Sequence, residues 1–400
     1  MPRILRIHNR LIIGGPTLNV LYLSKYLAPE FETQLIVGEK EGHEKDASFL
    51  ANQMGVKTTL VPGMGRSIHP LKDYNAYKQI KKMIKDFNPD IVHTHAAKPG
   101  AVGRLAASSS KVPVIVHTYH GHVFHSYFNR MKTNFIINTE RYLARKSDAL
   151  VAISAQQKKE LSYDFRIANE QKFRIVPLGF ELNKFLDDQH QKRKQFRNEF
   201  QLKDDEIAIG IIGRLVPVKN HVLFLDAIRF VLNNTSKNIR AFIIGDGEMR
   251  EALKVKARQS NIPFTTTDDF DSTATVVFTS WRNDIDIINA GLDIITLTSL
   301  NEGTPVSLIE AQAANKPIVS TRVGGIGDIV IENETALLSE VGDANKFHQN
   351  LLRVVDDDGL RIRLGNKGSR HVVDKFSVNR LATDMANLYR ELLIKKAGKQ

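Results

Sequence analysis

Asp293-Ile-Ile-Thr-Leu-Thr-Ser-Leu-Asn-Glu-Gly-Thr-Pro-Val-Ser-Leu-Ile-Glu-Ala-Gln-Ala-Ala314 reads as a buried strand, a short turn and the start of a helix. Thr304 stands where an N-cap residue is expected, and Pro305 where the first helical residue is expected. The amides of Val306 and Ser307 would then lie free at the positive end of the helix dipole, which favours an anion. The stretch therefore predicts an α/β sheet with an anion site at the end of one strand.

Two carboxylates flank this turn. Glu302 comes just before the predicted helix, and Glu310 follows about one and a half turns into it. Glu302 could simply interact with the helix dipole, and Glu310 could be a solvated helix residue. The helix around Glu310 is largely apolar, however, so a charge there needs a partner. A ligand could place a phosphate on the amides and hydroxyls on the two acids.

Composition limits the class of protein. The 400 residues are 42% hydrophobic and 25% charged, which suits two globular domains. Cysteine is absent, which excludes disulfides, thiolate zinc sites and cysteine nucleophiles and indicates a reducing compartment. Neither a signal peptide nor an apolar run of about 18 residues is apparent, so we expect a cytoplasmic protein.

The net charge of +12 lies entirely in the first half. Residues 1–185 hold 27 Lys and Arg against 15 Asp and Glu. This imbalance predicts an anionic partner, such as a membrane surface, a lipid phosphate or nucleic acid, although scattered lysines could equally serve solubility. The basic half has no segment in which lysines and arginines alternate densely with aromatic residues, so we do not expect a nucleic-acid partner.

Short apolar runs alternate with amphipathic segments in two series, which predicts two doubly wound parallel-sheet domains. We place the first domain at residues 1–182 and the second at residues 183–375. A helical stripe over residues 376–396 could pack on the second domain or return to the first. The predicted strands are Ile4–Ile7, Thr33–Val37, Val56–Val61, Asp90–Thr94, Val114–Thr118, Ala149–Ile153, Arg174–Pro177, Ile207–Ile212, Arg240–Ile244, Thr275–Phe278, Asp293–Thr298 and Pro317–Ser320.

Several polar groups follow the ends of predicted strands, where α/β proteins bind ligands. Arg214 and Lys219 follow the first strand of the second series and could neutralise a diphosphate. His120, beside Gly121, is the best candidate for a donor among six clustered histidines. A metal site is disfavoured because no carboxylate lies among them at zinc-ligand spacing. The dinucleotide fingerprint and the P-loop are both missing. The histidines are His93, His95, His117, His120, His122 and His125.

Together these motifs resemble the retaining family 4 group of the GT-B glycosyltransferases over nearly the whole chain. The resemblance implies two Rossmann-like domains facing across a cleft, with the acceptor bound by the first domain and a nucleotide-sugar donor by the second. The motifs that carry it are Glu302-x7-Glu310, Gly213-Arg214-Leu215 with Lys219-Asn220, Gly14-Gly15, Thr118-Tyr119-His120-Gly121, Val176-Pro177-Leu178-Gly179, and Gly324-Gly325 followed by Asp328.

The resemblance also implies roles for individual residues. Arg214 and Lys219 would hold the donor diphosphate together with amides of the Thr304–Ser307 turn, which contains Val306, and Gly303 would belong to the same donor-binding set. Glu310 would bind the ribose and Glu302 the donor sugar. Gly15 would let its loop approach the phosphates, and His120 would contact the sugar. The catalytic set is then Glu302, His120, Arg214 and Lys219, and neither a metal nor another cofactor is expected.

Two positions depart from the family pattern. Pro305 stands where a glycine is usual and removes one amide donor. Ser280 replaces a frequent glycine in the loop expected to meet the base, which puts the donor-binding role of Arg282 in doubt. The polar stretch Thr265–Thr275 is longer than expected and has no assigned role.

The sequence thus predicts a retaining, metal-independent hexosyl- or N-acetylhexosaminyltransferase. It would move a sugar from a nucleotide-diphosphate sugar, most often UDP-linked, to a lipid-linked or polysaccharide acceptor in surface glycan biosynthesis, with peripheral contact at the inner face of the membrane. The alternatives are a nucleotide-sugar 2-epimerase of the same architecture and a non-catalytic sugar-nucleotide binding protein.

Overall fold

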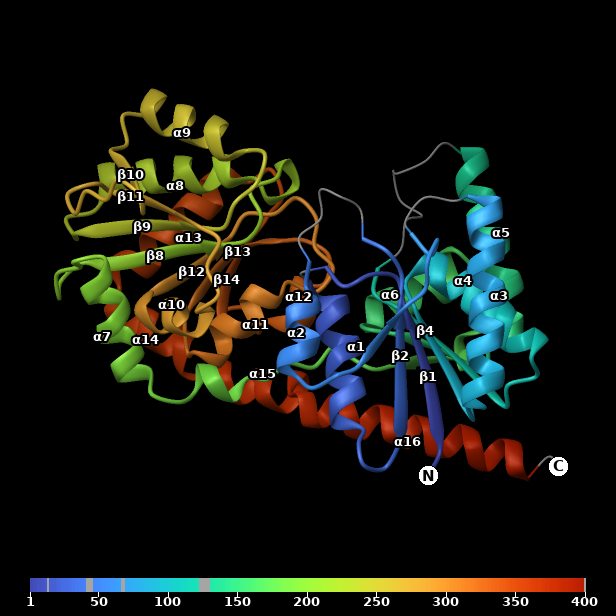
Figure 1. Cartoon of the computed structure of the whole chain (residues 1–400). Helices are drawn as coiled ribbons and strands as arrows, with labels where there is room; N and C mark the ends of the chain where they lie inside the picture. The colour runs from blue at the N-terminus through green and yellow to red at the C-terminus, as the bar shows by residue number, and fades with distance from the viewer. Residues whose placement is uncertain (13, 41–45, 66–68, 122–129, 399–400) are drawn as a thin grey trace. The chain divides into compact units, whose positions relative to one another are not determined.

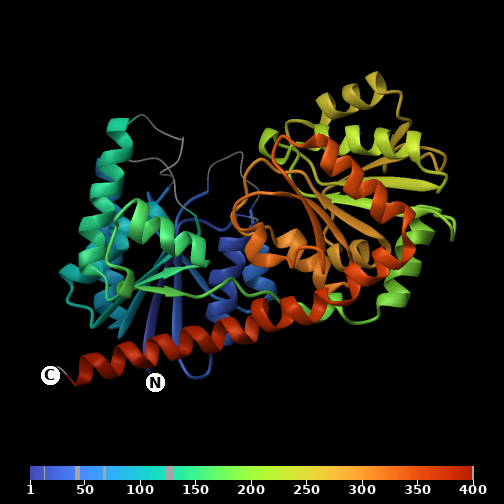
Figure 2. The same ribbon diagram turned by 180° about the vertical axis from the view of Figure 1, so that it is seen from behind.

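The computed structural model describes residues 1–12, 14–40, 46–65, 69–121 and 130–398, which fold into two compact units. The first unit comprises Met1–Phe180 and Phe376–Gln400, and the second comprises Glu181–Lys375. Each unit contains a seven-stranded parallel sheet with helices on both faces (Figures 1 and 2). The predicted α/β class with two doubly wound, Rossmann-like sheets is therefore confirmed.

The sheet of the first unit has the order β3-β2-β1-β4-β5-β6-β7. Alternate residues of its strands point to opposite faces. One face packs on α1 and α16, and the other packs on α3 and α4. The elements of this unit are β1 (Arg3–His8), α1 (Gly15–Tyr26), β2 (Glu32–Val37), α2 (Ser48–Gln53), β3 (Thr58–Leu60), α3 (Pro70–Phe87), β4 (Ile91–His95), α4 (Ala97–Ser109), β5 (Val114–Tyr119), α5 (Arg130–Lys146), β6 (Ala149–Ala152), α6 (Ala155–Lys159), β7 (Phe173–Ile175) and α16 (Val378–Ala397).

The sheet of the second unit has the order β10-β11-β9-β8-β12-β13-β14. Helices α8, α9 and α13 bury one of its faces, and Phe196 of α7 packs against Phe242 on the other. The elements of this unit are α7 (Gln189–Glu199), β8 (Ile207–Ile212), α8 (His221–Asn234), β9 (Ile239–Ile244), α9 (Arg250–Gln259), β10 (Phe264–Thr266), β11 (Val276–Ser280), α10 (Ile285–Gly291), β12 (Ile294–Leu297), α11 (Val306–Ala313), β13 (Ile318–Arg322), α12 (Ile326–Ile329), β14 (Ala336–Glu340), α13 (Ala344–Asp356), α14 (Asp358–Asn366) and α15 (Gly368–Phe376).

Helix α16 belongs to the first unit, where it forms part of the core with α1, β1, β4 and β5 (Figure 2). Its N-terminus is capped by Ser377, whose hydroxyl accepts a hydrogen bond from the amide of Arg380. Tyr389 lies in the middle of its buried stripe and is fully buried. The last helix of the chain therefore completes the core of the N-terminal sheet.

Two edge strands of the second sheet, β10 and β14, are missing from the sequence prediction. Strand β10 opens the polar stretch Thr265–Thr275, which continues as a turn organised by the hydroxyl of Thr265. That hydroxyl donates to the carbonyl oxygen of Asp269 and accepts from the amide of Asp271 at 2.9 Å. Part of the unassigned stretch is therefore an edge strand.

Both sheets reverse their winding direction at one strand. Strand β1 lies between β2 and β4, and β8 lies between β9 and β12. In open α/β sheets the carboxyl ends of the strands at such a switch point form the ligand-binding crevice. We therefore expect ligand-binding residues at the carboxyl ends of β8 and β12 in the second unit and of β1, β4 and β5 in the first.

Candidate active site

The turns after β8, β12 and β13 are joined to one another at the carboxyl edge of the second sheet. The amide of Leu300 donates to the carbonyl oxygen of Val218 at 2.8 Å, and the hydroxyl of Thr298 donates to the carbonyl oxygen of Lys219 at 2.9 Å. These bonds fix the turn that carries Lys219 against the turn that carries Glu302. Residues 83 positions apart in the chain therefore form one rigid surface.

Gly324 and Gly325 support the turn of Glu302 from the neighbouring strand. Gly324 has φ 49°, and a Cβ atom there would lie 1.7 Å from the carbonyl oxygen of Glu302. At Gly325 a Cβ atom would lie 2.0 Å from the carbonyl oxygen of Gly303. Only glycine permits this close backbone approach, which explains the Gly-Gly pair after β13.

Lys219 and Glu302 form an ion pair. The Lys219 Nζ atom donates to the Glu302 Oε1 atom at 2.5 Å, and the hydroxyl of Ser299 donates to the same oxygen at 2.6 Å. The two side chains are only 22% and 10% exposed, so the pair is held in partial shelter from water. The sequence predicted separate roles for these residues, and the structure brings the two together.

Arg214, directly after β8, is exposed. No hydrogen bond or ion pair connects its side chain to the part of the chain that the structure describes. A guanidinium in this state can bind a phosphate bidentately without first breaking another contact.

Helix α11 begins one residue later than predicted. Pro305, with φ −70° and ψ 106°, is the N-cap residue, and Val306 is the first helical residue. The expectation that Thr304 caps the helix and Pro305 opens it is therefore wrong by one position. The amide of Leu308 donates to the carbonyl oxygen of Pro305 at 3.2 Å. The amides of Val306 and Ser307 have no acceptor among the described residues, as an anion site requires.

Glu310 lies on α11 and is half-buried. Its carboxylate makes no hydrogen bond or ion pair with the residues that the structure describes. Burial raises the pKa of this carboxyl to about 7, against the opposing effect of Lys184 and with a smaller contribution from Asp286. A sheltered carboxylate without a partner is expected where a ligand supplies the missing donors.

Arg282 is committed to protein contacts. Its guanidinium donates to Asp284, with Nε 2.8 Å from Oδ1, and also to both carboxylate oxygens of Glu199 on α7. The hydrogen bonds that the guanidinium donates to Asp284, and then those to Glu199, raise its pKa. Because two carboxylates already neutralise it, its predicted part in donor binding would require these bonds to rearrange.

In the first unit, Gly15 is the first residue of α1, after the carboxyl end of β1. The hydroxyl of Thr17 donates to the carbonyl oxygen of Ile12 at 2.6 Å, which fixes the entry to the helix. The predicted loop at Gly15 is therefore a helix N-terminus on the ligand-binding edge of this sheet.

His120 follows β5 on the same edge and contacts a buried cluster that the sequence did not predict. Its Nε2 atom is 3.0 Å from Nδ1 of His95, and its own Nδ1 atom has no partner among the residues that the structure describes. His93 and His117 are buried within the sheet, in keeping with a structural role. His122 and His125 lie outside the described residues. Among the described residues, no three His, Cys, Asp or Glu side chains cluster as a metal site requires.

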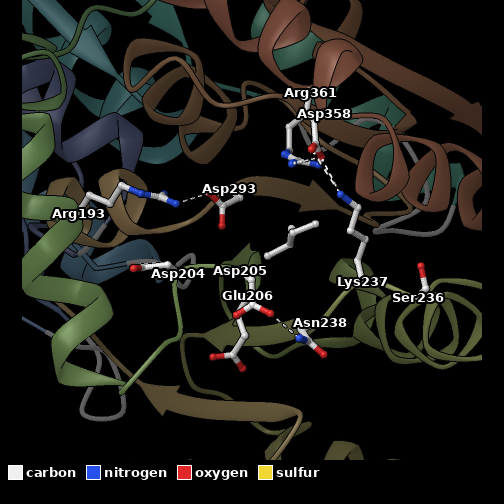
Figure 3. Close-up of a pocket in the computed structure, with 11 residues that line it drawn as sticks. Arg193, Asp204, Asp205, Glu206, Ser236, Lys237, Asn238, Asp293, Asp358 and Arg361 are labelled. Carbon is white, nitrogen blue, oxygen red and sulfur yellow. Dashed lines mark hydrogen bonds and ion pairs between the residues drawn. The ribbon is translucent and has the colours of Figure 1, made fainter.

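A hollow of about 360 Å³ lies at the opposite, amino edge of the second sheet, where β8, β9 and β12 begin (Figure 3). Each of its arginines is paired with a carboxylate of the same lining, Arg193 with Asp293 at 2.8 Å and Arg361 with Asp358 at 2.6 Å. This hollow contains none of the predicted site residues, and its paired charges leave little for a ligand to bind.

Two family models match the chain. The model described as "Glycosyltransferase Family 4" covers residues 13–184, and the model described as "Glycosyl transferases group 1" covers residues 192–371. Residues 185–191 separate the two matches, one of which lies mainly in the first structural unit and the other in the second. The chain belongs to the group 1 glycosyltransferases of the GT-B fold. This glycosyltransferase is therefore an enzyme whose candidate residues lie on the ligand-binding edges of both sheets.

Individual relatives agree. The glycosyltransferase is 29% identical over 342 residues to an Escherichia coli "UDP-Gal:alpha-D-GlcNAc-diphosphoundecaprenol alpha-1,3-galactosyltransferase", covering 85% of each chain. It is 23% identical over 333 residues to the capsular polysaccharide biosynthesis glycosyltransferase CapM of Staphylococcus aureus, covering 82% of this chain and 84% of the relative. The crystal structure of Anabaena Alr3699/HepE in complex with UDP has the same fold, with a TM-score of 0.81, 15% identity and coverage of 97% and 100%.

Proposed function

We propose that this glycosyltransferase moves a hexose or N-acetylhexosamine from a UDP-sugar to a lipid-linked or saccharide acceptor, with retention and without a metal ion. The observation that carries the proposal is the arrangement after β8 and β12. Within the described residues, one edge of the sheet carries the unpaired guanidinium of Arg214, the ion-paired ammonium of Lys219, the free amides of Val306 and Ser307 and the unpartnered carboxylate of Glu310. A nucleoside diphosphate sugar has phosphates that suit the cations and amides, and hydroxyls that suit the carboxylate.

The proposed donor contacts follow from these groups. Arg214 and the amides of Val306 and Ser307 bind the diphosphate, and Glu310 accepts hydrogen bonds from the ribose hydroxyls. Lys219 turns toward the phosphate that leaves, and Glu302 accepts from hydroxyls of the sugar. The UDP-linked donors of the E. coli relative and the UDP complex of the Anabaena protein support a uridine nucleotide.

The proposed reaction breaks the bond between the anomeric carbon and the phosphate oxygen. An acceptor oxygen bonds to that carbon on the same face, and its proton passes to the departing phosphate. Negative charge grows on the phosphate as the bond breaks, and fixed cations and amides stabilise it more strongly in the transition state than in the ground state. No separate protein base is needed, and these groups supply the charge that a metal ion could otherwise supply.

The proposal is tested with purified protein, UDP-galactose, UDP-glucose and UDP-N-acetylglucosamine, and a diphosphate-linked lipid acceptor bearing N-acetylglucosamine. We expect one donor to raise the melting temperature and to give UDP and an α-linked glycolipid, with unchanged rates in EDTA. A β-linked product would refute retention, and loss of activity in EDTA would refute metal independence. Epimerised sugar nucleotide formed without acceptor would replace the proposal with the isomerase.

Membrane contact is proposed through a lysine patch on the first unit, defined by Lys81, Lys82, Lys85 and Lys111. These lysines line a hollow at the amino edge of the sheet beside α3. Lys82, Lys85 and Lys111 are exposed and make no ion pair with the described residues. An anionic bilayer attracts such a patch by about 1 kcal/mol per lysine. No helix of the described residues is long and apolar enough to cross a membrane.

Reversing the charge of three patch lysines, K82E, K85E and K111E together, should weaken binding to phosphatidylglycerol vesicles by about 10²-fold or more, since the loss of three attractive contacts alone accounts for that factor. Vesicle co-sedimentation measures this. The matched control is the triple variant K254E, K256E and K367E on the second unit, which changes the net charge equally. Equal loss in both triple variants would show that only overall charge matters and would contradict the patch.

A further inference from the structure

A buried arginine and three imidazoles form a continuous row in the first unit. Arg6 on β1 pairs in register with His93 on the neighbouring strand β4, and His95 lies two residues further along β4. Arg6, His93 and His95 are fully buried. His120 follows β5 and ends the row at the carboxyl edge of the sheet. The row therefore leads from the interior to the ligand-binding edge.

The Arg6 guanidinium makes its contacts through one nitrogen. Its Nη1 atom lies 2.9 Å from Nδ1 of His93 and 3.2 Å from Nε2 of His95, with the Tyr389 hydroxyl of α16 at 3.4 Å. In the described part of the chain no carboxylate contacts this guanidinium, and its Nε and Nη2 atoms have no partner. A buried cation without a counter-ion favours neighbours that present lone pairs.

The imidazoles beside this cation are neutral at pH 7. Burial, and then the charge of Arg6, lowers the pKa of His93 well below its usual value. Burial first and the other imidazoles next lower the pKa of His95 in the same direction. Burial, with a smaller effect of His8, lowers the pKa of His120 to about 3. Each ring therefore carries one N–H proton, on either Nδ1 or Nε2.

The hydrogen-bond partners along the row determine which nitrogen of each ring carries the proton. A guanidinium can only donate, so Nε2 of His95 must accept and its proton must sit on Nδ1. That Nδ1–H lies 3.0 Å from Nε2 of His120, and the two rings are tilted by only 21° with centroids 5.2 Å apart. The N–H of one ring thus points in plane at the lone pair of the other. Nε2 of His120 must accept, and its proton must sit on Nδ1.

We propose that Arg6 sets the tautomer of His120 through His95, so that the Nδ1–H of His120 is held as a free hydrogen-bond donor for an oxygen atom of a bound substrate. This Nδ1 atom is buried and has no partner in the described structure. Its ligand is a hydroxyl or phosphate oxygen, because each bond in the row aligns a dipole whose positive end faces outward. Arg6 and His95 are positioning residues, and their role at the reaction rests on the function proposed above.

The tautomer is measured without any substrate, so this test does not depend on the proposed function. Long-range ¹H–¹⁵N spectra of histidine-labelled protein distinguish Nδ1–H from Nε2–H rings, and H120N identifies the His120 signals. We expect Nδ1–H in His95 and His120, and Nε2–H in His93, whose Nε2 lies 2.8 Å from the hydroxyl of Thr118. An Nε2–H ring at His120 in the unaltered protein would overturn the proposal.

Two substitutions test the direction of the relay. R6M keeps much of the side-chain volume but removes the donor, so His120 should become a mixture of tautomers. H93Q cuts the other branch of the Arg6 contacts and should leave the Nδ1–H tautomer of His120 unchanged. A pure Nδ1–H ring at His120 in a folded R6M protein would show that Arg6 does not set it. Should R6M fail to fold, an Nε2–H ring at His120 in the spectrum of the unaltered protein would still overturn the proposal.

Transfer assays then test the use of this donor. An asparagine amide can occupy the place of Nδ1, whereas a glutamine amide reaches the place of Nε2. We expect H120Q to lower kcat/KM about tenfold, the value of one hydrogen bond, and H120N to retain more activity than H120Q. UDP-galactose should shift the His120 Nδ1–H signal if the oxygen atom belongs to the sugar nucleotide. The lipid acceptor should shift it if the oxygen atom belongs to the acceptor. A signal moved by neither, with equal loss in both variants, would refute the substrate contact while leaving the tautomer result intact.

Discussion

Replacing Lys219 with methionine should lower kcat/KM for sugar transfer by about 10³-fold, measured as UDP released in the presence of acceptor. The bond from the Thr298 hydroxyl to the Lys219 carbonyl oxygen fixes the backbone of Lys219 at the carboxyl edge of the sheet, so the ammonium has only to rotate from Glu302 toward the departing phosphate. Fixed charges of this kind contribute most at the moment when negative charge develops. The fall should appear mainly in kcat, with a smaller change in the affinity for UDP, which Arg214 and the α11 amides retain.

The ion pair with Glu302 requires a control for stability. Removing Lys219 leaves a carboxylate that is only 10% exposed without its cation, so K219M should also lose about 1 kcal/mol of unfolding free energy. The double variant K219M with E302Q removes both charges and should recover most of that stability while staying inactive. K256M breaks a comparable ion pair, with Asp226 at 2.7 Å, and should keep full activity. Full activity in K219M, or recovery of activity in the double variant, would contradict the phosphate role.

The sheet architecture was predictable because buried parallel strands appear as short apolar runs between amphipathic helices. The two edge strands were not predicted. Strand β10 is three residues long and polar, and β14 ends in Ser339-Glu340, so neither produces a strong hydrophobic signal. The start of α11 was misplaced by one residue because Pro305 suits both the N-cap and the first helical position, and its ψ of 106° is set by the surrounding turn.

The places of the candidate residues at strand ends were predictable, but the pairings between them were not. Glycines and charges after strands indicated where Arg214, Lys219, Glu302 and Glu310 lie, because strand ends converge at one edge. The contact between Lys219 and Glu302 depends on how two turns pack, which no local pattern encodes. The row from Arg6 to His120 depends equally on register between β1 and β4. Histidines within a strand therefore indicated burial, and only the structure revealed a directed chain of hydrogen bonds.

Replacing Glu310 with glutamine should stabilise the protein and at the same time weaken UDP binding about 10²-fold. The raised pKa means that the folded protein holds this proton more tightly than the unfolded chain does, between the usual value of 4.5 and about 7. The unfolding free energy therefore falls as pH rises through this window, and the ionised side chain costs about 3 kcal/mol at pH 8. E310Q removes that cost because its amide is neutral at every pH.

The melting temperature of E310Q should therefore exceed that of the unaltered protein at pH 8, and the difference should shrink as the pH falls below 4.5, where Glu310 is protonated in both the folded and unfolded states. Ribose hydroxyls donate to the carboxylate, so UDP affinity of the unaltered protein should rise as pH increases through 7, whereas that of E310Q should not. Titration calorimetry with UDP at several pH values measures the affinities of both proteins. E334Q, which removes an exposed carboxylate paired with Lys367, should change neither quantity. Unchanged UDP affinity in E310Q would refute the ribose contact even if the protein were stabilised, because burial alone explains the gain in stability and only a ligand contact explains the loss of binding.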